Sequence, residues 1–268
     1  MTRIALGDTD INIQDEGRGT PVLLLHGFPT THLLWQNVVP ALAAAGLRSI
    51  APDLVGFGQS QAEEGLDIQM GNQARWMFRL LDALRLDQKP VLVAHDIGTA
   101  VAQLMAAHAP ERIRGLVLID GVYADQWAME EVESIRHWEL SAAARLPKLL
   151  VRRVGSWTER TESQELLRKM LAADEGAIAG VRIIRAANSM DPRSTVEILE
   201  QLRHRHPPSV ILWGQSDRFL SLDGVARPLA DLLDAELKVL PGGHFLPLDC
   251  PERVAAEIEA FVRTLQEK

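Results

Sequence analysis

The sequence predicts an α/β protein in which a mostly parallel sheet is flanked by helices and interrupted by a long helical segment. Short strand-like runs occur four times in the first half, at residues 22–25, 48–51, 91–94 and 116–119, and all but the second are apolar at every position. Continuous runs of this kind are typical of strands covered on both faces, whereas a half-exposed strand alternates. Helical patterns separate them, at residues 33–45, 70–86 and 99–108. This alternation indicates a doubly wound sheet.

The second half has a different pattern. From residue 122 to residue 207 the chain is helix-like and has no run typical of a buried strand. Two further strand-like runs follow, each before a helical pattern: 210–213 before 224–233, and 237–240 before 251–265. We therefore expect a core formed by residues 1–121 and 208–268, with a helical insertion at 122–207 over the strand ends.

Composition and charge narrow the class of protein. The 268 residues are 47% hydrophobic and 24% charged, as in a globular chain. With 28 Lys and Arg against 36 Asp and Glu, the net charge of −8 argues against a nucleic-acid partner. No apolar run reaches the roughly 18 residues of a membrane span, and residues 1–7 do not begin a signal peptide, so we expect a cytoplasmic protein without a membrane partner. The single cysteine, Cys250, excludes an internal disulfide and a cysteine-based metal site, and we expect no cofactor or metal.

The strongest chemical signal is Asp96, in the segment VLVAHDIGTA at residues 91–100. The segment is typical of a strand, a sharp turn and a helix, with the small residues Ala94 and Gly98 on either side of the centre. Such a turn lifts its central side chain above the sheet and places it at the positive end of a helix, which favours an anion. An ionised Asp96 needs no base to become a nucleophile. The alternative is that Asp96 only caps the following helix.

With this turn, the chain resembles the α/β-hydrolase superfamily, in the branch whose nucleophile is an aspartate instead of a serine. That branch contains haloalkane dehalogenases, haloacetate dehalogenases and epoxide hydrolases. The resemblance covers nearly the whole chain and rests on four segments in the family's order: 26–29 (HGFP), 53–60, 91–100 and 242–245 (GGHF). It implies an α/β-hydrolase fold with a helical cap inserted after the sixth strand.

A carboxylate nucleophile favours reaction at saturated carbon. Attack on an acyl group would give a labile anhydride, whereas displacement at saturated carbon gives an alkyl ester. Water must then attack that ester, which requires a general base, and His244 after Gly242-Gly243 is the candidate. The resemblance implies that the backbone N–H groups of Phe28 and Ile97 stabilise the oxyanion that forms.

Two acids compete for the role of orienting His244. Asp217 follows the run at 210–213, the commonest position in the family. Asp120 ends the run at 116–119, where haloacetate dehalogenases and some haloalkane dehalogenases keep their acid. We favour Asp120, because the segment after it also resembles the haloacetate branch. The other acid would then be a structural turn residue.

That segment contains the pair His137-Trp138. In haloacetate dehalogenases a His-Trp pair of the cap donates hydrogen bonds to the departing halide, and imidazole and indole N–H groups suit this role. The alternative is a solvated His137 and a Trp138 that packs in the core of a cap helix. Four arginines of the insertion either bind a substrate acid or form a solvated face: Arg152, Arg153, Arg182 and Arg185.

Departures from the family bear on the substrate. Phe28 and Ile97 stand where haloalkane dehalogenases often have Asn and Trp, and Ile97 and Ala100 stand where haloacetate enzymes have arginines. The only tyrosine, Tyr123, excludes a two-tyrosine epoxide hydrolase site. We expect a dehalogenase that acts on a small organic halide and water, with an epoxide hydrolase as the alternative. A non-catalytic ligand-binding protein and an esterase-like hydrolase are more remote alternatives. The sequence does not identify the substrate, and it leaves open whether the protein forms a homodimer.

Overall fold

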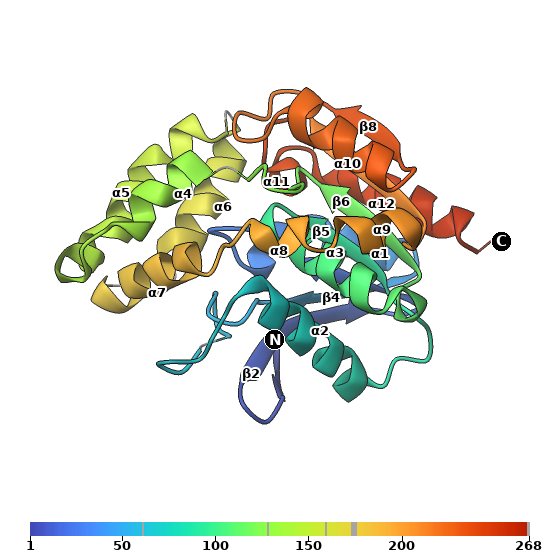
Figure 1. Cartoon of the computed structure of the whole chain (residues 1–268), viewed down its shortest axis with the longest axis horizontal. Coiled ribbons are helices and arrows are strands. Elements are labelled where there is room, and N and C mark those ends of the chain that lie inside the picture. The colour runs from blue at the N-terminus through green and yellow to red at the C-terminus, as the bar shows by residue number, and fades with distance from the viewer. Residues whose placement is uncertain (61, 128, 159, 173–175, 267–268) are drawn as a thin grey trace.

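An eight-stranded sheet forms the centre of the protein (Figure 1). The computed structural model describes residues 1–60, 62–127, 129–158, 160–172 and 176–266. The strands are β1 (Thr2–Ala5), β2 (Asp10–Gly17), β3 (Thr20–Leu25), β4 (Leu47–Pro52), β5 (Val91–His95), β6 (Gly115–Ile119), β7 (Ser209–Gly214) and β8 (Glu236–Leu240). They lie in the order β1-β2-β4-β3-β5-β6-β7-β8. β2 is antiparallel to β1 and β4, and all other neighbours are parallel.

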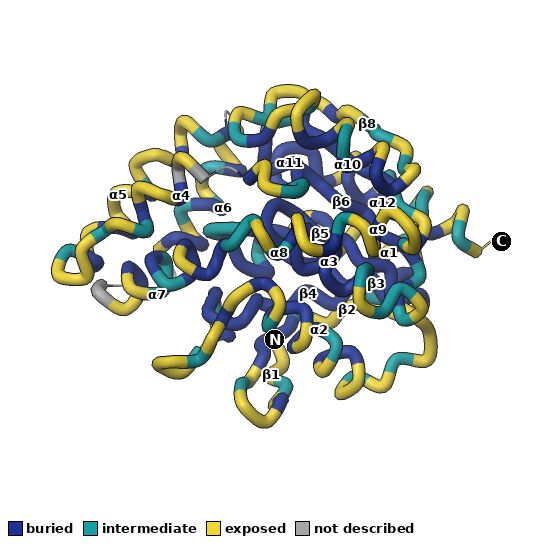
Figure 2. Tube along the Cα trace, viewed as in Figure 1, coloured by how far each residue is buried: buried dark blue, intermediate teal, exposed yellow. Residues whose placement is uncertain are grey.

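The expected α/β-hydrolase fold is confirmed, and the six predicted strands are β3 to β8. β3, β5 and β6 are buried along their whole length, as covered parallel strands should be (Figure 2). The sequence did not predict β1 and β2, which extend the sheet as an antiparallel edge. Their signal is weak because only Ile11 and Ile13 of β2 are apolar and its other side chains are polar.

Helices cover both faces of the sheet. α1 (Val39–Ala44) and α12 (Pro251–Thr264) pack together on one face, and α2 (Met70–Leu84) and α3 (Ile97–His108) pack together on the other. The shorter helices of the core are η1 (His32–Trp35), η2 (Pro110–Arg112), η5 (Leu222–Ala226), α10 (Arg227–Leu232) and α11 (Leu246–Asp249). The helix expected at 33–45 is thus divided into η1 and α1.

The segment between β6 and β7 is helical in its described part. Its elements are α4 (Met129–Arg136), η3 (Leu140–Arg145), α5 (Leu146–Arg153), η4 (Val154–Ser156), α6 (Thr161–Ala172), α7 (Gly176–Asn188), α8 (Arg193–Val196) and α9 (Leu199–His204). α4 to α7 extend beyond the edge of the sheet, at the left of Figure 1. Across the described residues, no helix is both long and apolar enough to span a bilayer.

The register of the sheet aligns the ends of its central strands. Leu25 of β3 pairs with Ala94 of β5, and His95 of β5 pairs with Ile119 of β6. The loops that follow these strands therefore start at the same edge of the sheet. In open α/β sheets, ligands bind beyond this carboxyl edge, so it is where the functional side chains should meet.

Candidate active site

Asp96 occupies a sharp turn between β5 and α3. Its backbone has φ 52° and ψ −125°, a conformation that is strained for a non-glycine residue and persists only where neighbouring structure holds it. Two glycines make this turn sterically accessible. A Cβ on Gly27 would lie 2.4 Å from the Cβ of Asp96, and a Cβ on Gly98 would lie 2.6 Å from the carbonyl oxygen of His26. These contacts explain why only glycine fits at either position.

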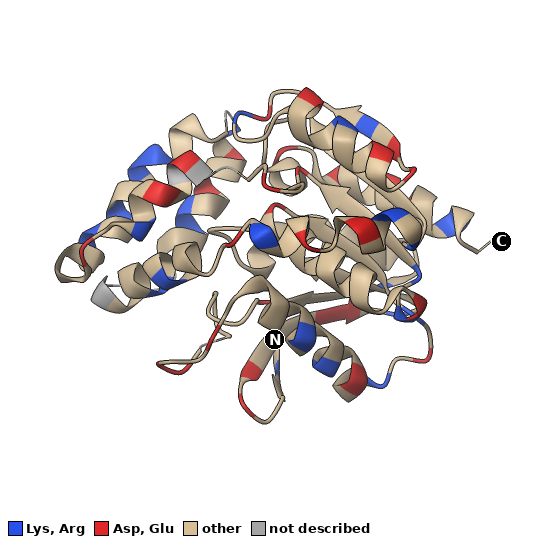
Figure 3. Cartoon of the chain, in the orientation of Figure 1, with Lys and Arg blue, Asp and Glu red and all other residues tan. Residues whose placement is uncertain are grey.

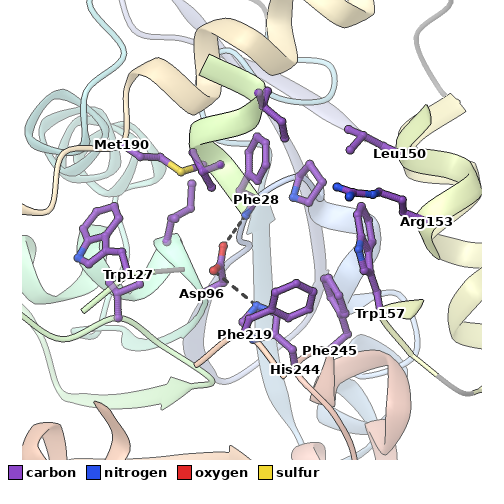
Figure 4. A pocket seen from close by; sticks show the side chains of 15 residues that line it. Phe28, Asp96, Trp127, Leu150, Arg153, Trp157, Met190, Phe219, His244 and Phe245 are labelled. Carbon is purple, nitrogen blue, oxygen red and sulfur yellow. Dashed lines mark hydrogen bonds and ion pairs between the residues drawn. The ribbon is translucent and has the colours of Figure 1, made fainter. Parts of the chain in front are cut away.

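The two carboxylate oxygens of Asp96 face different partners. Oδ1 accepts a hydrogen bond from the backbone N–H of Phe28 at 2.7 Å, and Oδ2 lies 3.5 Å from Nε2 of His244 (Figure 4). Burial alone would raise the pKa of Asp96, but His244 and the backbone N–H of Ile97 outweigh burial and hold the pKa below its usual value. Asp96 is therefore an anion at neutral pH, with the N–H groups of Phe28 and Ile97 at its carboxylate.

A buried polar cluster holds the loop that carries Phe28. Asp53 accepts a hydrogen bond from the backbone N–H of His32 at 2.8 Å, and Nδ1 of the same histidine lies 2.8 Å from that oxygen. The backbone N–H of Leu54 donates to Nε2 of His26 at 3.0 Å. These contacts tie the loop after β3 to the loop after β4, so the N–H of Phe28 is preorganised toward Asp96.

His244, in the loop after β8, lies against Asp217, in the loop after β7. Nδ1 of His244 is 2.9 Å from Oδ2 of Asp217, and Oδ1 of Asp217 accepts from the backbone N–H groups of Phe219 and Leu220 at 2.8 and 3.1 Å. Burial alone would lower the pKa of His244, but the carboxylates of Asp217 and Asp96 outweigh burial and raise it well above 6.5. At neutral pH His244 is therefore a cation between two anions.

The structure corrects the preference for Asp120 as the partner of His244. Oδ1 of Asp120 instead accepts from the backbone N–H of Gly214 at 2.6 Å, and Oδ2 is buried without a hydrogen-bond partner in the described part of the chain. Burial and the nearby charge of Asp217 raise the pKa of Asp120 well above its usual range, which favours its neutral form. The reason is directional: Asp120, with φ 43°, turns its carboxyl toward the backbone of β7.

The structure also corrects the expected halide-binding pair. The side chain of His137 is 77% exposed, and its Nε2 lies 2.9 Å from Glu133. Val132 and Ile135 of α4 line the cavity beside Asp96. His137 comes two positions after Ile135, and two positions correspond to a rotation of about 200° around a helix, so His137 points away from the cavity. Trp138 does not line this cavity either, and its indole nitrogen is buried without a partner among the described residues.

A cavity opens at Asp96 and His244, and most of its wall is hydrocarbon (Figure 4). It contains about 680 Å³ of space free of atoms, its open mouth included. Its other described lining residues are Phe28, Pro29, Ile97, Val122, Trp127, Val132, Ile135, Leu150, Arg153, Trp157, Met190, Phe219 and Phe245. This environment suits a small, largely apolar organic molecule whose reactive carbon lies at Asp96.

Sequence reasoning missed three aromatic residues of this wall: Trp127, Trp157 and Phe219. The ring of Phe219 lies 5.0 Å from the ring of His244, and Trp157 stacks on Phe245 at 6.3 Å between ring centroids. Phe219 stands two residues after Asp217, so its proximity to that acid was an available signal. Trp157 had no such signal, because only the path of the helical segment brings it to the strand ends.

In the described ranges, no group of three or more His, Cys, Asp or Glu side chains is arranged to hold a metal ion. The polar groups that converge on the cavity are instead Asp96, its backbone donors and His244 with Asp217. Nucleophilic catalysis requires these groups: an anionic nucleophile, a base oriented by a carboxylate, and backbone hydrogen-bond donors.

Comparison with known proteins gives the family. The model of the family described as "alpha/beta hydrolase fold" matches residues 20–166. Haloalkane dehalogenase 2 of Mycobacterium bovis is 30% identical over 260 residues, which cover 92% of this chain and 90% of that protein. A haloalkane dehalogenase structure from Bradyrhizobium elkani aligns with a TM-score of 0.84 at 24% identity, over 99% of this chain and 98% of that chain. A thermophilic esterase from Thermogutta terrifontis aligns with a TM-score of 0.82 at 25% identity, over 99% of each chain. The chain belongs to the α/β-hydrolase fold family, in its dehalogenase branch.

Proposed function

We propose that this protein is a hydrolase that cleaves the carbon–halogen bond of a small organic halide through a covalent ester on Asp96. The main support for the proposal is the environment of Asp96. Its carboxylate is an anion at the turn after β5; one oxygen accepts a hydrogen bond from a backbone N–H group, and the other faces His244. Residues 122–207 would form a cap over a core of residues 1–121 and 208–268, because α4 and α5 supply part of the cavity wall.

In the first step, Oδ2 of Asp96 attacks the saturated carbon from the side opposite the halogen. The C–O bond forms as the carbon–halogen bond breaks, and the halide leaves with the bonding electron pair. Asp96 is only 7% exposed, so few water molecules compete with the substrate for its carboxylate. We assign the halide to the indole N–H of Trp157, since Trp127, the other indole of the wall, already donates to Ala124 and Thr195.

In the second step, His244 accepts a proton from water, and the oxygen of that water attacks the ester carbon of Asp96. Negative charge then develops on Oδ1, which the backbone N–H of Phe28 contacts at 2.7 Å in the free enzyme. Asp217 stabilises the imidazolium that forms. Collapse of the intermediate breaks the bond between Oδ2 and the ester carbon, and the alcohol leaves with Oδ2 and a proton from His244. The acid proton left on Asp96 then passes to His244, which restores the ion pair of the resting enzyme.

The charge of Asp96 couples the two steps. The carboxylate of Asp96 is one of the groups that raise the pKa of His244. Forming the ester removes that negative charge, so the pKa of His244 should fall once the first step is complete. The cation of the resting enzyme thereby loses its proton to solvent and becomes the neutral base that the second step requires.

The Asp96→Asn variant tests this coupling, because the amide has the size of the carboxylate and the charge of the ester. We expect the pKa of His244 to be lower in Asp96→Asn than in the wild type, measured by NMR titration of its ring carbons. The control is Asp223→Asn, which removes the same charge from an exposed side chain beside Arg227. A pKa that is unchanged or higher in Asp96→Asn would contradict the coupling.

Epoxide hydrolysis is the second candidate, and the cavity favours it less. An epoxide oxygen needs a proton as its ring opens, whereas a halide leaves without one. No described lining residue carries a hydroxyl group, and Tyr123 is not part of the described lining. An esterase reaction through Asp96 is weaker still, because a carboxylate that attacks an acyl carbon forms an anhydride.

The source of the product oxygen tests the function directly. With enzyme in excess over 1-bromohexane in heavy-oxygen water, the 1-hexanol of the first turnover should carry ordinary oxygen from Asp96. The heavy isotope should appear in the Asp96 peptide, and in product only on later turnovers. Heavy oxygen in the first product would mean direct attack by water and would remove Asp96 from its role. Parallel assays of an epoxide by diol formation identify the second candidate.

A further inference from the structure

One strongly basic side chain, Arg153, belongs to a wall that is otherwise mostly hydrocarbon. Arg153 is the last residue of α5, and its side chain reaches into the cavity between Leu150 and Trp157 (Figure 4). Leu150 and Arg153 are three residues apart, so they share the face of α5 that is turned toward the cavity. Arg152 is exposed and does not line the cavity, because it is one position off that face.

Arg153 is at the open end of the cavity. It is exposed to solvent although it lines the wall, whereas Asp96 and His244 are only 7% and 4% exposed. The leaving halide must separate next to Asp96, at the closed end. A guanidinium at the mouth is therefore suited to a different group of the substrate, one that stays in contact with water.

The helix that carries Arg153 is basic in a protein of net charge −8. α5 carries Lys148, Arg152 and Arg153 and no acidic residue, and its basic residues form a blue area at the upper left of Figure 3. A neighbouring pocket that shares Trp157 with the cavity is lined by two further arginines, Arg160 and Arg218, and by one acid, Asp249. Local charge of this sign attracts anionic molecules to the mouth.

We propose that the substrate is an organic halide with a carboxylate at the end remote from the halogen, and that Arg153 binds that carboxylate. The planar guanidinium offers two parallel N–H donors that match the two oxygens of a carboxylate. The apolar wall between Arg153 and Asp96 accommodates the intervening hydrocarbon. This inference rests on the proposed dehalogenation and adds the class of substrate to it.

Bromide release from 6-bromohexanoate and from 1-bromohexane tests the inference, since the two differ only in the carboxylate. The wild type should have the higher kcat/KM for the acid. Arg153→Gln should reduce kcat/KM for the acid about tenfold, mainly through KM, because a charge-assisted hydrogen bond is lost at a partly solvated site. Any change for 1-bromohexane should be much smaller than the change for the acid, so the ratio of the two kcat/KM values should fall about tenfold. Arg153→Lys should recover part of the loss for the acid. Arg152→Gln, the matched control on the same helix, should behave as the wild type.

Calorimetric binding of hexanoate separates this inference from the proposed reaction, because hexanoate has no leaving group. Hexanoate should bind the wild type and Arg152→Gln, and bind Arg153→Gln about tenfold more weakly. If neither bromide is released but this binding pattern holds, the dehalogenation is wrong and the anion site stands. Equal hexanoate affinity in the wild type and Arg153→Gln would overturn the anion site. Loss of binding in Arg218→Gln alone would also overturn it, by placing the acid in the neighbouring pocket.

Discussion

Replacing His244 with alanine should produce an enzyme that reacts once with an organic halide and then stops. Asp96 keeps the backbone N–H donor of Phe28 in this variant, so the first step should still form the ester. The second step loses the base that accepts a proton from water, and its rate should fall by at least about 10³-fold. Intact mass spectrometry after addition of 1-bromohexane should show one added hexyl group, and peptide mapping should place it on Asp96.

His137→Ala is the matched control for this experiment. This variant also replaces a histidine with alanine, but the side chain of His137 is 77% exposed and pairs with Glu133 at the protein surface. That variant should turn over at the wild-type rate and accumulate no hexyl adduct. An unmodified His244→Ala protein that still releases bromide at the wild-type rate would contradict the two-step mechanism. An adduct on any other residue would contradict Asp96 as its nucleophile.

Asp217→Asn and Asp120→Asn should differ widely in turnover. Asp217 is 2.9 Å from Nδ1 of His244 and stabilises its cationic form, so the amide should reduce kcat by about 10³- to 10⁴-fold. Asp120 accepts a hydrogen bond from the backbone N–H of Gly214, and its raised pKa favours the neutral form, so an amide of the same size should change kcat only a few-fold. Steady-state bromide release measures both, and thermal unfolding of each variant reports whether the fold is intact.

The pH dependence distinguishes the two acids further. Asp217 raises the pKa of His244, so Asp217→Asn should lower that pKa, while Asp120→Asn should leave it near the wild-type value. NMR titration of the ring of His244 in both variants reads the effect without turnover. If a folded Asp120→Asn protein loses as much activity as Asp217→Asn, the hydrogen bond between His244 and Asp217 does not identify the acid that assists His244 in catalysis.

Much of the core could be predicted from the sequence because its signals are local. β3 to β8 each contain a short segment rich in apolar residues, and each segment is detectable without knowledge of its partner strand. The edge strand β2 could not be predicted in this way, since its side chains outside Ile11 and Ile13 are polar and its stability comes from pairing with β1 and β4.

By itself, the sequence determined that Asp96 occupies a tight turn at the end of a buried strand, because the apolar run and Gly98 lie within a few residues of it. Only the tertiary structure decided that His244 meets Asp217, that His137 faces solvent, and that Arg153 reaches the cavity. Each of these outcomes depends on the direction of a side chain relative to segments far away in the chain. For His137 and Arg153 these directions follow from the packing of the helices between β6 and β7, and for His244 and Asp217 they follow from the loops after β8 and β7. No local pattern contains that information.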